Sequence, residues 1–200
     1  MRPKLIIKTL SISLSVFLGT SYWVIAQASQ FFTSQQINQQ RVVVIARPYG
    51  DGKYDLVVVE QVQGKRKCWQ EKGRNPVIID PLLLEFDYTG ICRRATDSNS
   101  YSVRINGKDR GLEYLLRIVP SESELCLVAT PLSSHTSGIV IGRTNGFKSL
   151  SYLKIALEPG WQITKRVYAR TGKVLGHFYL ENKNLVKPNL SCSNSQNTKI

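Results

Sequence analysis

The chain has few acidic residues and very few of the side chains on which catalysis most often depends. Against 27 Lys and Arg it has only 14 Asp and Glu, which leaves a net charge of +13, and it has two histidines. No C-x-x-C and no G-x-S-x-G sequence occurs, so neither a zinc ribbon, a thioredoxin-like centre nor a hydrolase nucleophile elbow is indicated. We therefore predict no metal site and no cofactor, and a binding or structural protein in preference to an enzyme.

Long apolar runs are missing after the first 26 residues, so no stable membrane span is expected in the rest of the chain. The first residues have the parts of a signal peptide: positive charges before residue 9, an apolar run over 10–25 and the small-x-small sequence AQA at 26–28. We expect cleavage after Ala28 and export to the periplasm or beyond the cell. The alternative is an uncleaved anchor over Thr9 to Ala26, about 18 residues long.

The positive charge persists after this processing and points to an anionic partner. Residues 1–28 hold three basic and no acidic residue, so the net charge of the mature chain is +10. Such an excess attracts polyanions. Export disfavours nucleic acid and leaves envelope polymers with carboxylate or phosphate groups, or anionic lipid headgroups. The simpler interpretation is a solvated surface that only keeps the protein soluble.

Residues 29–200 divide by composition into a polar leader at 29–41, a β-rich domain at 42–181 and a flexible polar tail at 182–200. The middle part alternates apolar runs of about five to nine residues with turn residues, and Asn-Gly at 106–107 directly follows a run, as in a hairpin. The pattern predicts a single, mainly antiparallel β-sandwich or barrel-like domain. The apolar run at 80–87 fits a buried strand or a helical turn.

Alternation within the strand predicted at 161–170 separates two faces. One face carries mostly apolar residues, namely Trp161, Ile163, Lys165 and Val167. The other is assigned to solvent and carries Gln162, Thr164, Arg166, Tyr168 and Arg170. Four cysteines complete the pattern: Cys68, Cys92, Cys126 and Cys192. In an exported chain an even number of cysteines favours disulfides, and three pairings are possible.

Three long segments resemble a known family. RPYGDGKYDLVVVEQVQGKRKCW, NPVIIDPLLLEFDYTGICRRATDSNSYSVRINGKDRGLEYLLRIV and LKIALEPGWQITKRVYARTGKVLGHFYLE are similar to the cyanobacterial family called domain of unknown function 3747, over Val42 to Leu180. The resemblance implies an exported or cell-envelope protein of a cyanobacterium and carries over no activity or catalytic residue. It also implies a Cys68–Cys92 disulfide. Cys192 lies outside the region; it either attaches the tail to Cys126, or both cysteines are free.

The histidines and acidic residues have simpler interpretations than catalysis. His135 lies in a loop sequence, and His177 lies in a strand, where we expect a hydrogen-bonded ring. Asp80, Glu85, Asp87 and Asp97 form an acidic cluster in the sequence, which is the candidate source of a carboxylate pair for glycoside hydrolysis.

Two of these acidic residues, Asp80 and Asp87, lie in turn sequences. The sequence DSNSY at 97–101 lacks the downstream Glu of a calcium loop, so we expect an Asx-turn before a strand at 101–105. A glycan-acting enzyme of the envelope that uses Asp87 or Asp97 is the alternative function.

Basic residues interleaved with aromatic residues are the candidate ligand-binding feature. Arginine forks bind carboxylates and phosphates, and aromatic rings stack on sugar rings. The candidate residues are Lys67, Trp69, Arg93, Arg94, Arg166 and Tyr168. We expect a secreted envelope module that binds an anionic cell-wall or extracellular polysaccharide, with a protein–protein interaction domain as a further alternative. The simpler interpretation is that Trp69 packs over the disulfide and the arginines are only solvated.

Overall fold

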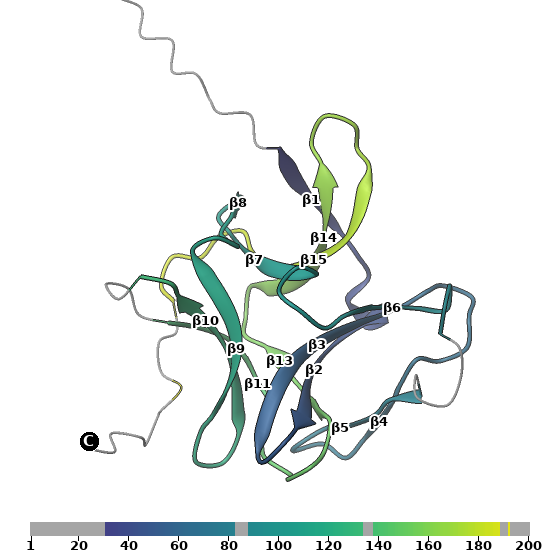
Figure 1. The fold of residues 1–200 in the computed structure, drawn as a ribbon, viewed down its shortest axis with the longest axis vertical. Coiled ribbons are helices and arrows are strands. Elements are labelled where there is room, and N and C mark those ends of the chain that lie inside the picture. The colour runs from purple at the N-terminus through teal and green to yellow at the C-terminus, as the bar shows by residue number, and fades with distance from the viewer. Residues whose placement is uncertain (1–30, 83–87, 134–137, 189–191, 193–200) are drawn as a thin grey trace, which may run out of the picture.

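The computed structural model describes residues 31–82, 88–133, 138–188 and 192, which form a mainly β fold (Figure 1). This confirms the predicted fold class. The predicted signal peptide, His135, Glu85 and Asp87 lie outside the described residues. None of the helices in the described ranges is long and apolar enough to cross a membrane.

The strands form three curled sheets. The five-stranded sheet has the order β1 (Phe32–Gln36), β14 (Trp161–Tyr168), β15 (Val174–Asn182), β7 (Tyr101–Ile105) and β8 (Lys108–Asp109). The four-stranded sheet has the order β13 (Ala156–Leu157), β11 (Ile139–Arg143), β10 (Leu125–Pro131) and β9 (Tyr114–Pro120). The six-stranded sheet has the order β4 (Gln70–Lys72), β5 (Ile78–Asp80), β12 (Leu153–Lys154), β2 (Val42–Tyr49), β3 (Lys53–Gln61) and β6 (Cys92–Ala95). A 3-10 turn, η1 (Gln39–Arg41), precedes β2.

Strand pairing within the described residues is antiparallel with one exception. β15 runs parallel to β7, with Phe178 opposite Tyr101 and Asn182 opposite Ile105. The two strands are joined by a connection that passes through the four-stranded sheet. The prediction of an antiparallel domain therefore holds for every other described pair, and this one parallel pair attaches β7 and β8 to β15 in the five-stranded sheet.

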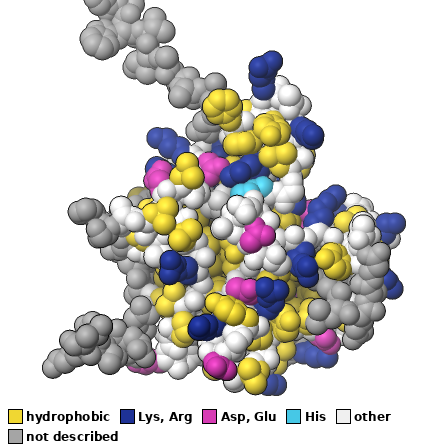
Figure 2. Space-filling model, in the orientation of Figure 1, with side chains coloured by type: hydrophobic (Ala, Val, Ile, Leu, Met, Phe, Trp, Pro, Cys, Tyr) yellow, Lys and Arg dark blue, Asp and Glu magenta, His cyan; other side chains and the backbone are white. Residues whose placement is uncertain are grey.

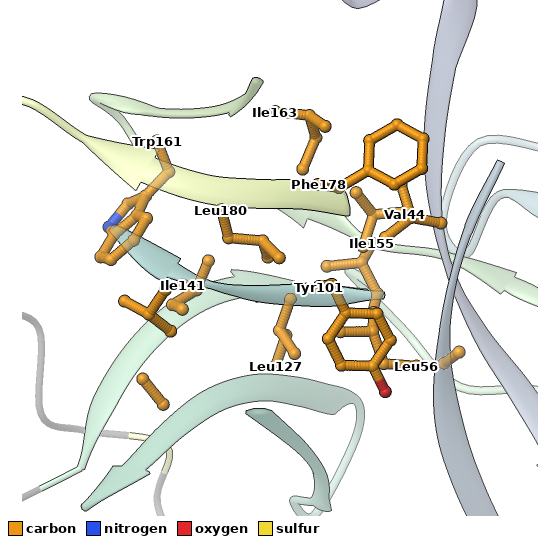
Figure 3. Packing of buried hydrophobic residues seen from close by; sticks show 14 of the residues in the cluster. Val44, Leu56, Tyr101, Leu127, Ile141, Ile155, Trp161, Ile163, Phe178 and Leu180 are labelled. Carbon is orange, nitrogen blue, oxygen red and sulfur yellow. The ribbon is translucent and has the colours of Figure 1, made fainter. Parts of the chain in front are cut away.

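The main core lies where the three sheets face one another (Figure 3). Each sheet contributes large apolar side chains to it, and these include Val44, Leu56, Tyr101, Leu127, Ile141, Ile155, Trp161, Ile163, Phe178 and Leu180. Burial of this apolar surface is the main source of stability in such a domain.

The central strands β2 and β3 are buried on both faces, which explains their unbroken Val and Ile runs. In β2, Val44 points into the main core, whereas the neighbouring Val43 joins a second, outer cluster. β3 alternates in the same way. The outer cluster includes Cys68 and Cys92, which form a disulfide with a Cα–Cα distance of 6.1 Å. This bond, which the family resemblance implies, holds the segment that covers the outer face.

Two turns that were predicted from local sequence are present in the structure. Asn106 and Gly107 both have positive φ, 49° and 75°, and join β7 to β8 by a two-residue loop, as a type I′ hairpin requires. The carboxylate of Asp97 accepts a hydrogen bond of 2.9 Å from the backbone N–H of Asn99 just before β7. Both the hairpin and the Asx-turn were predicted from these residues.

The fold includes parts of the predicted leader and tail. β1 lies in the leader and pairs with β14 from Phe32 opposite Tyr168 onward. In the tail, Leu185 exchanges two hydrogen bonds with the side chain of Asn106, at 2.8 and 3.1 Å. Cys192 is bonded to Cys126, so no cysteine of the chain is free.

Candidate functional site

Two pockets lie on either side of the C-terminal end of β3. Successive residues of a strand point to opposite faces of the sheet, so Glu60 lines one pocket and Gln61 lines the other. We call them the lysine pocket and the tryptophan pocket after Lys165 and Trp69. β6 pairs with this end of β3 and places Arg93 opposite Glu60.

The lysine pocket, with a volume of about 380 Å³, opens between the five-stranded and six-stranded sheets. Its lining residues are Gln35, Ile37, Glu60, Arg93, Lys165, Val174, Leu175 and Gly176. The Lys165 side chain is only 4% exposed, and its Nζ lies 3.0 Å from Glu60 Oε2. Arg93 Nη1 donates to the same oxygen at 3.3 Å, with its side chain 58% exposed. Two cations therefore share one carboxylate.

Burial governs the electrostatics of Lys165. It lowers the pKa of the ammonium group below its ordinary value, while the contact with Glu60 opposes the shift. The Nζ also lies 3.2 Å from the ring centroid of Phe178, a cation–π arrangement. Within the described chain Nζ makes no hydrogen bond of good geometry. The pocket thus holds two cations against one carboxylate; Lys165 Nζ itself is buried, and Arg93 is the cation that faces solvent.

The tryptophan pocket, with a volume of about 630 Å³, combines an aromatic ring with planar polar side chains. Its lining residues are Gln40, Gln61, Lys67, Trp69, Gln70 and Glu71. Trp69 packs partly against the outer cluster, and its indole N–H donates to Glu71 at 3.3 Å. Lys154 pairs with the same carboxylate at 2.8 Å.

Gln61 holds the loop that carries Lys67 and Trp69. Its side-chain N–H donates to the carbonyl of Arg66 at 2.9 Å, and its side-chain oxygen accepts from the backbone N–H of Cys68 at 2.9 Å. The Cys68–Cys92 disulfide then attaches this loop to β6. The side-chain amide of Gln61 and the disulfide together fix the backbone directly before Trp69, the residue whose ring lines the pocket.

The structure brings some of the predicted binding residues together and separates others. Lys67 and Trp69 share the tryptophan pocket, and Arg93 lines the lysine pocket. Arg94 follows Arg93 in β6 and therefore lies on the opposite face. There its guanidinium lies 4.9 Å from the ring centroid of Tyr88 and donates to the Tyr88 hydroxyl at 3.0 Å.

The remaining two predicted residues, Arg166 and Tyr168, lie on the five-stranded sheet. Arg166 is half-buried and donates to Asp109 at 2.6 Å and to the Tyr179 hydroxyl at 2.7 Å. Tyr168 stacks on Phe32 of β1, with ring centroids 5.2 Å apart. These side chains therefore hold β1, β8 and β15 against β14.

A serine–histidine pair lies in the same network. Ser102 Oγ is 2.9 Å from His177 Nε2, and His177 Nδ1 is 2.9 Å from the carbonyl oxygen of Asn99. Because a carbonyl only accepts, Nδ1 carries the proton and Nε2 accepts from Ser102. Burial lowers the pKa of His177, so the ring is neutral at neutral pH. The expectation of a hydrogen-bonded ring in a strand is confirmed.

The surroundings of Ser102 oppose a nucleophilic role. Besides His177, Arg166 Nη2 lies 3.3 Å and Asp109 Oδ1 3.4 Å from its Oγ. Ser102 is also buried, with 7% of its surface exposed, so its Oγ is not open to a substrate. The Ser102–His177 arrangement is that of a structural network.

The predicted acidic residues that the structure describes have local partners. Asp80 forms an ion pair of 2.8 Å with Lys72, and Asp97 caps the turn before β7. The described ranges hold no group of three His, Cys, Asp or Glu that is arranged to hold a metal ion.

Sequence reasoning missed Lys165 and Glu60 as site residues. The signal for Lys165 was present, because alternation placed this charged residue on the apolar face of its strand. The signal for Glu60 was a single carboxylate at the end of the buried run of β3. What the sequence lacked was the packing of β14 against β3, which brings the two together.

The fold and the pockets define a class: a disulfide-linked, mainly β protein suited to an oxidising, non-cytoplasmic environment. The chain belongs to the family described as Protein of unknown function (DUF3747), whose model matches residues 8–185. This confirms the resemblance and extends it beyond Val42 to Leu180. No curated protein and no solved structure matches the chain.

Proposed function

We propose that this is an exported cyanobacterial envelope protein that binds an anionic polysaccharide. The observation that carries the proposal is the unbalanced positive charge of the lysine pocket, together with the tryptophan pocket on the other face of the same end of β3. A polysaccharide with carboxylate groups matches the two pockets, because different units of one chain offer a charged group to the first and a sugar ring to the second. Export is supported by the two disulfides and by the signal-like sequence at 1–28.

The lysine pocket supplies the site for a carboxylate. Lys165 lies at its base and Arg93 at its exposed edge, and both already share Glu60. An incoming carboxylate gives the cluster a second anion and accepts hydrogen bonds from the exposed guanidinium of Arg93. Such charge-assisted hydrogen bonds in a pocket are stronger than those between neutral groups.

The tryptophan pocket supplies the site for the sugar ring. The Trp69 face offers an apolar platform whose orientation is set by Glu71 and by the packing beneath it. The amides of Gln40 and Gln70 provide donors and acceptors for hydroxyl groups. Lys67 is exposed at the pocket and adds positive charge.

The binding surface we propose differs from the set of six residues predicted from the sequence. It keeps Lys67, Trp69 and Arg93 and adds Lys165. Arg166 is left out because its guanidinium is engaged by Asp109 and Tyr179.

The test is co-sedimentation of the oxidised protein with purified cell-wall and exopolysaccharide fractions across a salt series. We expect retention at low salt that falls steeply as salt rises, because exposed charges are screened. Arg93→Ala should weaken retention, whereas Arg110→Ala, which removes an arginine paired with Glu113 outside both pockets, should not. Equal retention of both variants, or no retention at low salt, would reject the proposal.

A further inference from the structure

The hairpin between β14 and β15 extends beyond the body of the fold, with β1 beside it (Figure 1). We define the hairpin tip as residues 168–174 together with Phe31. Large apolar side chains are exposed there: Phe31 is 83%, Val174 48% and Tyr168 41% accessible. Exposed aromatic side chains gathered at a projecting end are unusual on a protein surface and mark an interaction site.

The charged side chains at the tip are all basic. Arg170 and Lys173 are exposed in the turn, and no acidic residue occurs between positions 159 and 180 or between 31 and 50. The corresponding part of Figure 2, at the top of the molecule, shows yellow hydrophobic and dark-blue basic side chains together. Asp109 lines a pocket with Phe31, but it is ion-paired with Arg166. The tip therefore combines apolar surface with unpaired positive charge, which is the complement of an anionic lipid surface.

The tip is also rigid at its base. Phe32 stacks on Tyr168, and the Arg166 guanidinium lies 4.8 Å from the Phe32 ring centroid. The backbone N–H of Gly172 donates to the carbonyl of Tyr168 at 2.9 Å, which closes the turn. The exposed side chains are thus presented by an ordered element, so little conformational entropy is lost when they bind.

The path of the chain supports the same partner. The backbone N–H of Ala169 donates to the carbonyl of Phe31 at 3.0 Å. The segment that precedes Phe31, with its apolar run at 10–25, therefore joins the fold directly beside the hairpin tip.

We propose that the hairpin tip docks on an anionic lipid bilayer, with Phe31, Tyr168 and Val174 at the level of the headgroups. Arg170 and Lys173 contact the lipid phosphates. Aromatic rings favour this interfacial region, and basic residues near an anionic surface add to the binding. This inference is independent of the proposed polysaccharide binding, because the side chains named here other than Val174 line neither pocket.

The test uses the protein as cells export it, with vesicles of phosphatidylglycerol or of phosphatidylcholine. Hydrogen exchange measured by mass spectrometry reports on the peptide that covers 168–174, so the result does not depend on whether residues 1–28 are retained. We expect slower exchange at the tip with phosphatidylglycerol vesicles and unchanged exchange with phosphatidylcholine. A tip that exchanges equally in both cases overturns the proposal.

Two matched variants identify the contribution of the tip. Phe31→Ser with Lys173→Glu removes one apolar and one basic side chain from the tip, and should weaken binding to phosphatidylglycerol vesicles by about tenfold or more. Leu150→Ser with Lys148→Glu makes the same changes elsewhere, at a leucine that is 76% exposed. An equal loss of binding in both variants overturns the proposal. Slower exchange at the tip that depends on protein concentration in the absence of vesicles also overturns it, because the partner is then a second copy of the chain.

Discussion

Lys165 of β14 and Glu60 of β3 form an ion pair of 3.0 Å between two different sheets, and both side chains are largely buried. This pair joins the five-stranded sheet to the six-stranded sheet at the edge of the main core. Glu60 has a second cationic partner in Arg93, whereas Lys165 has no other carboxylate among its described contacts. The pair is therefore asymmetric, and its two halves should respond differently to substitution.

Removing Glu60 should destabilise the fold more than removing Lys165. Glu60→Gln leaves Lys165 buried without a counter-charge, and such a loss costs about 3 kcal/mol of unfolding free energy. In Lys165→Met the apolar stem is retained and Arg93 still neutralises Glu60, so the cost should be about 1 kcal/mol or less. Urea unfolding of both variants measures the difference. The reverse order of stability would show that Arg93 does not compensate for Lys165.

Short-range features of the fold could be predicted from the sequence because they depend on neighbouring residues. Asn106-Gly107 determines its own hairpin through two positive φ angles, and Asp97 determines its own turn. The unbroken Val run of β3 indicates burial on both faces. Each conclusion follows from local conformational preference or from period-two alternation.

Long-range relationships could not be predicted in the same way. The parallel pairing of β15 with β7 joins residues that are far apart in the chain, and no local signal specifies it. Arg166 and Thr164 were assigned to solvent by alternation, yet Thr164 is fully buried and Arg166 is half-buried in the network with Asp109. Alternation shows which residues share a face, but it does not show what covers that face.

Acid should destabilise the protein through His177. Burial lowers its pKa below that of an unfolded chain, so the unfolded state binds a proton more readily below about pH 6.5. Neutral His177 therefore contributes fully to the free energy of unfolding above this pH. That contribution is lost as the pH falls toward the lower pKa of the folded state. The free energy of unfolding in urea should therefore be lower at pH 5 than at pH 7.

His177→Gln provides the control for this acid effect, because glutamine does not titrate. The variant should be less stable at pH 7 but should lose less stability between pH 7 and pH 5 than the native chain. An unchanged slope would show that other groups cause the loss. At alkaline pH the same network predicts a second loss, because burial and the hydrogen bond to Asp109 raise the pKa of Tyr179 to about 12. Its contribution declines above about pH 10, where the unfolded tyrosine ionises.

Loss of the Cys68–Cys92 disulfide should loosen the tryptophan pocket before it unfolds the domain. The two cysteines are 24 positions apart, and by the chain-entropy estimate their bond contributes about 3 kcal/mol. In Cys68→Ala with Cys92→Ala we expect faster hydrogen exchange over residues 62–72. The core strands β2 and β3 should remain protected.

The matched control removes the other disulfide, through Cys126→Ala with Cys192→Ala. That variant should leave exchange over residues 62–72 unchanged, because Cys192 lies in the C-terminal tail. Loosening of the pocket segment in both double variants would contradict the assignment, since it would indicate a general loss of stability.

Replacing each of the two lysines in the loop before Trp69 distinguishes binding at the tryptophan pocket from a general effect of net charge. Lys65 and Lys67 are both exposed, but only Lys67 lines the tryptophan pocket. Lys67→Ala should therefore weaken retention on an acidic polysaccharide and reduce its salt dependence, whereas Lys65→Ala should have little effect. Salt-series co-sedimentation measures both, and equal losses would indicate that net charge alone drives the interaction.

Trp69 should contribute to binding through its ring face. Trp69→Ala removes the platform and should reduce affinity for an acidic polysaccharide by about fivefold to tenfold, the range expected for one aromatic contact. Trp69→Phe keeps an aromatic face and should retain most of the affinity, although it loses the hydrogen bond to Glu71. Urea unfolding of both variants accounts for the packing of Trp69 on the outer cluster. If Trp69→Ala binds as the native chain does while remaining folded, the ring serves only to cover the disulfide.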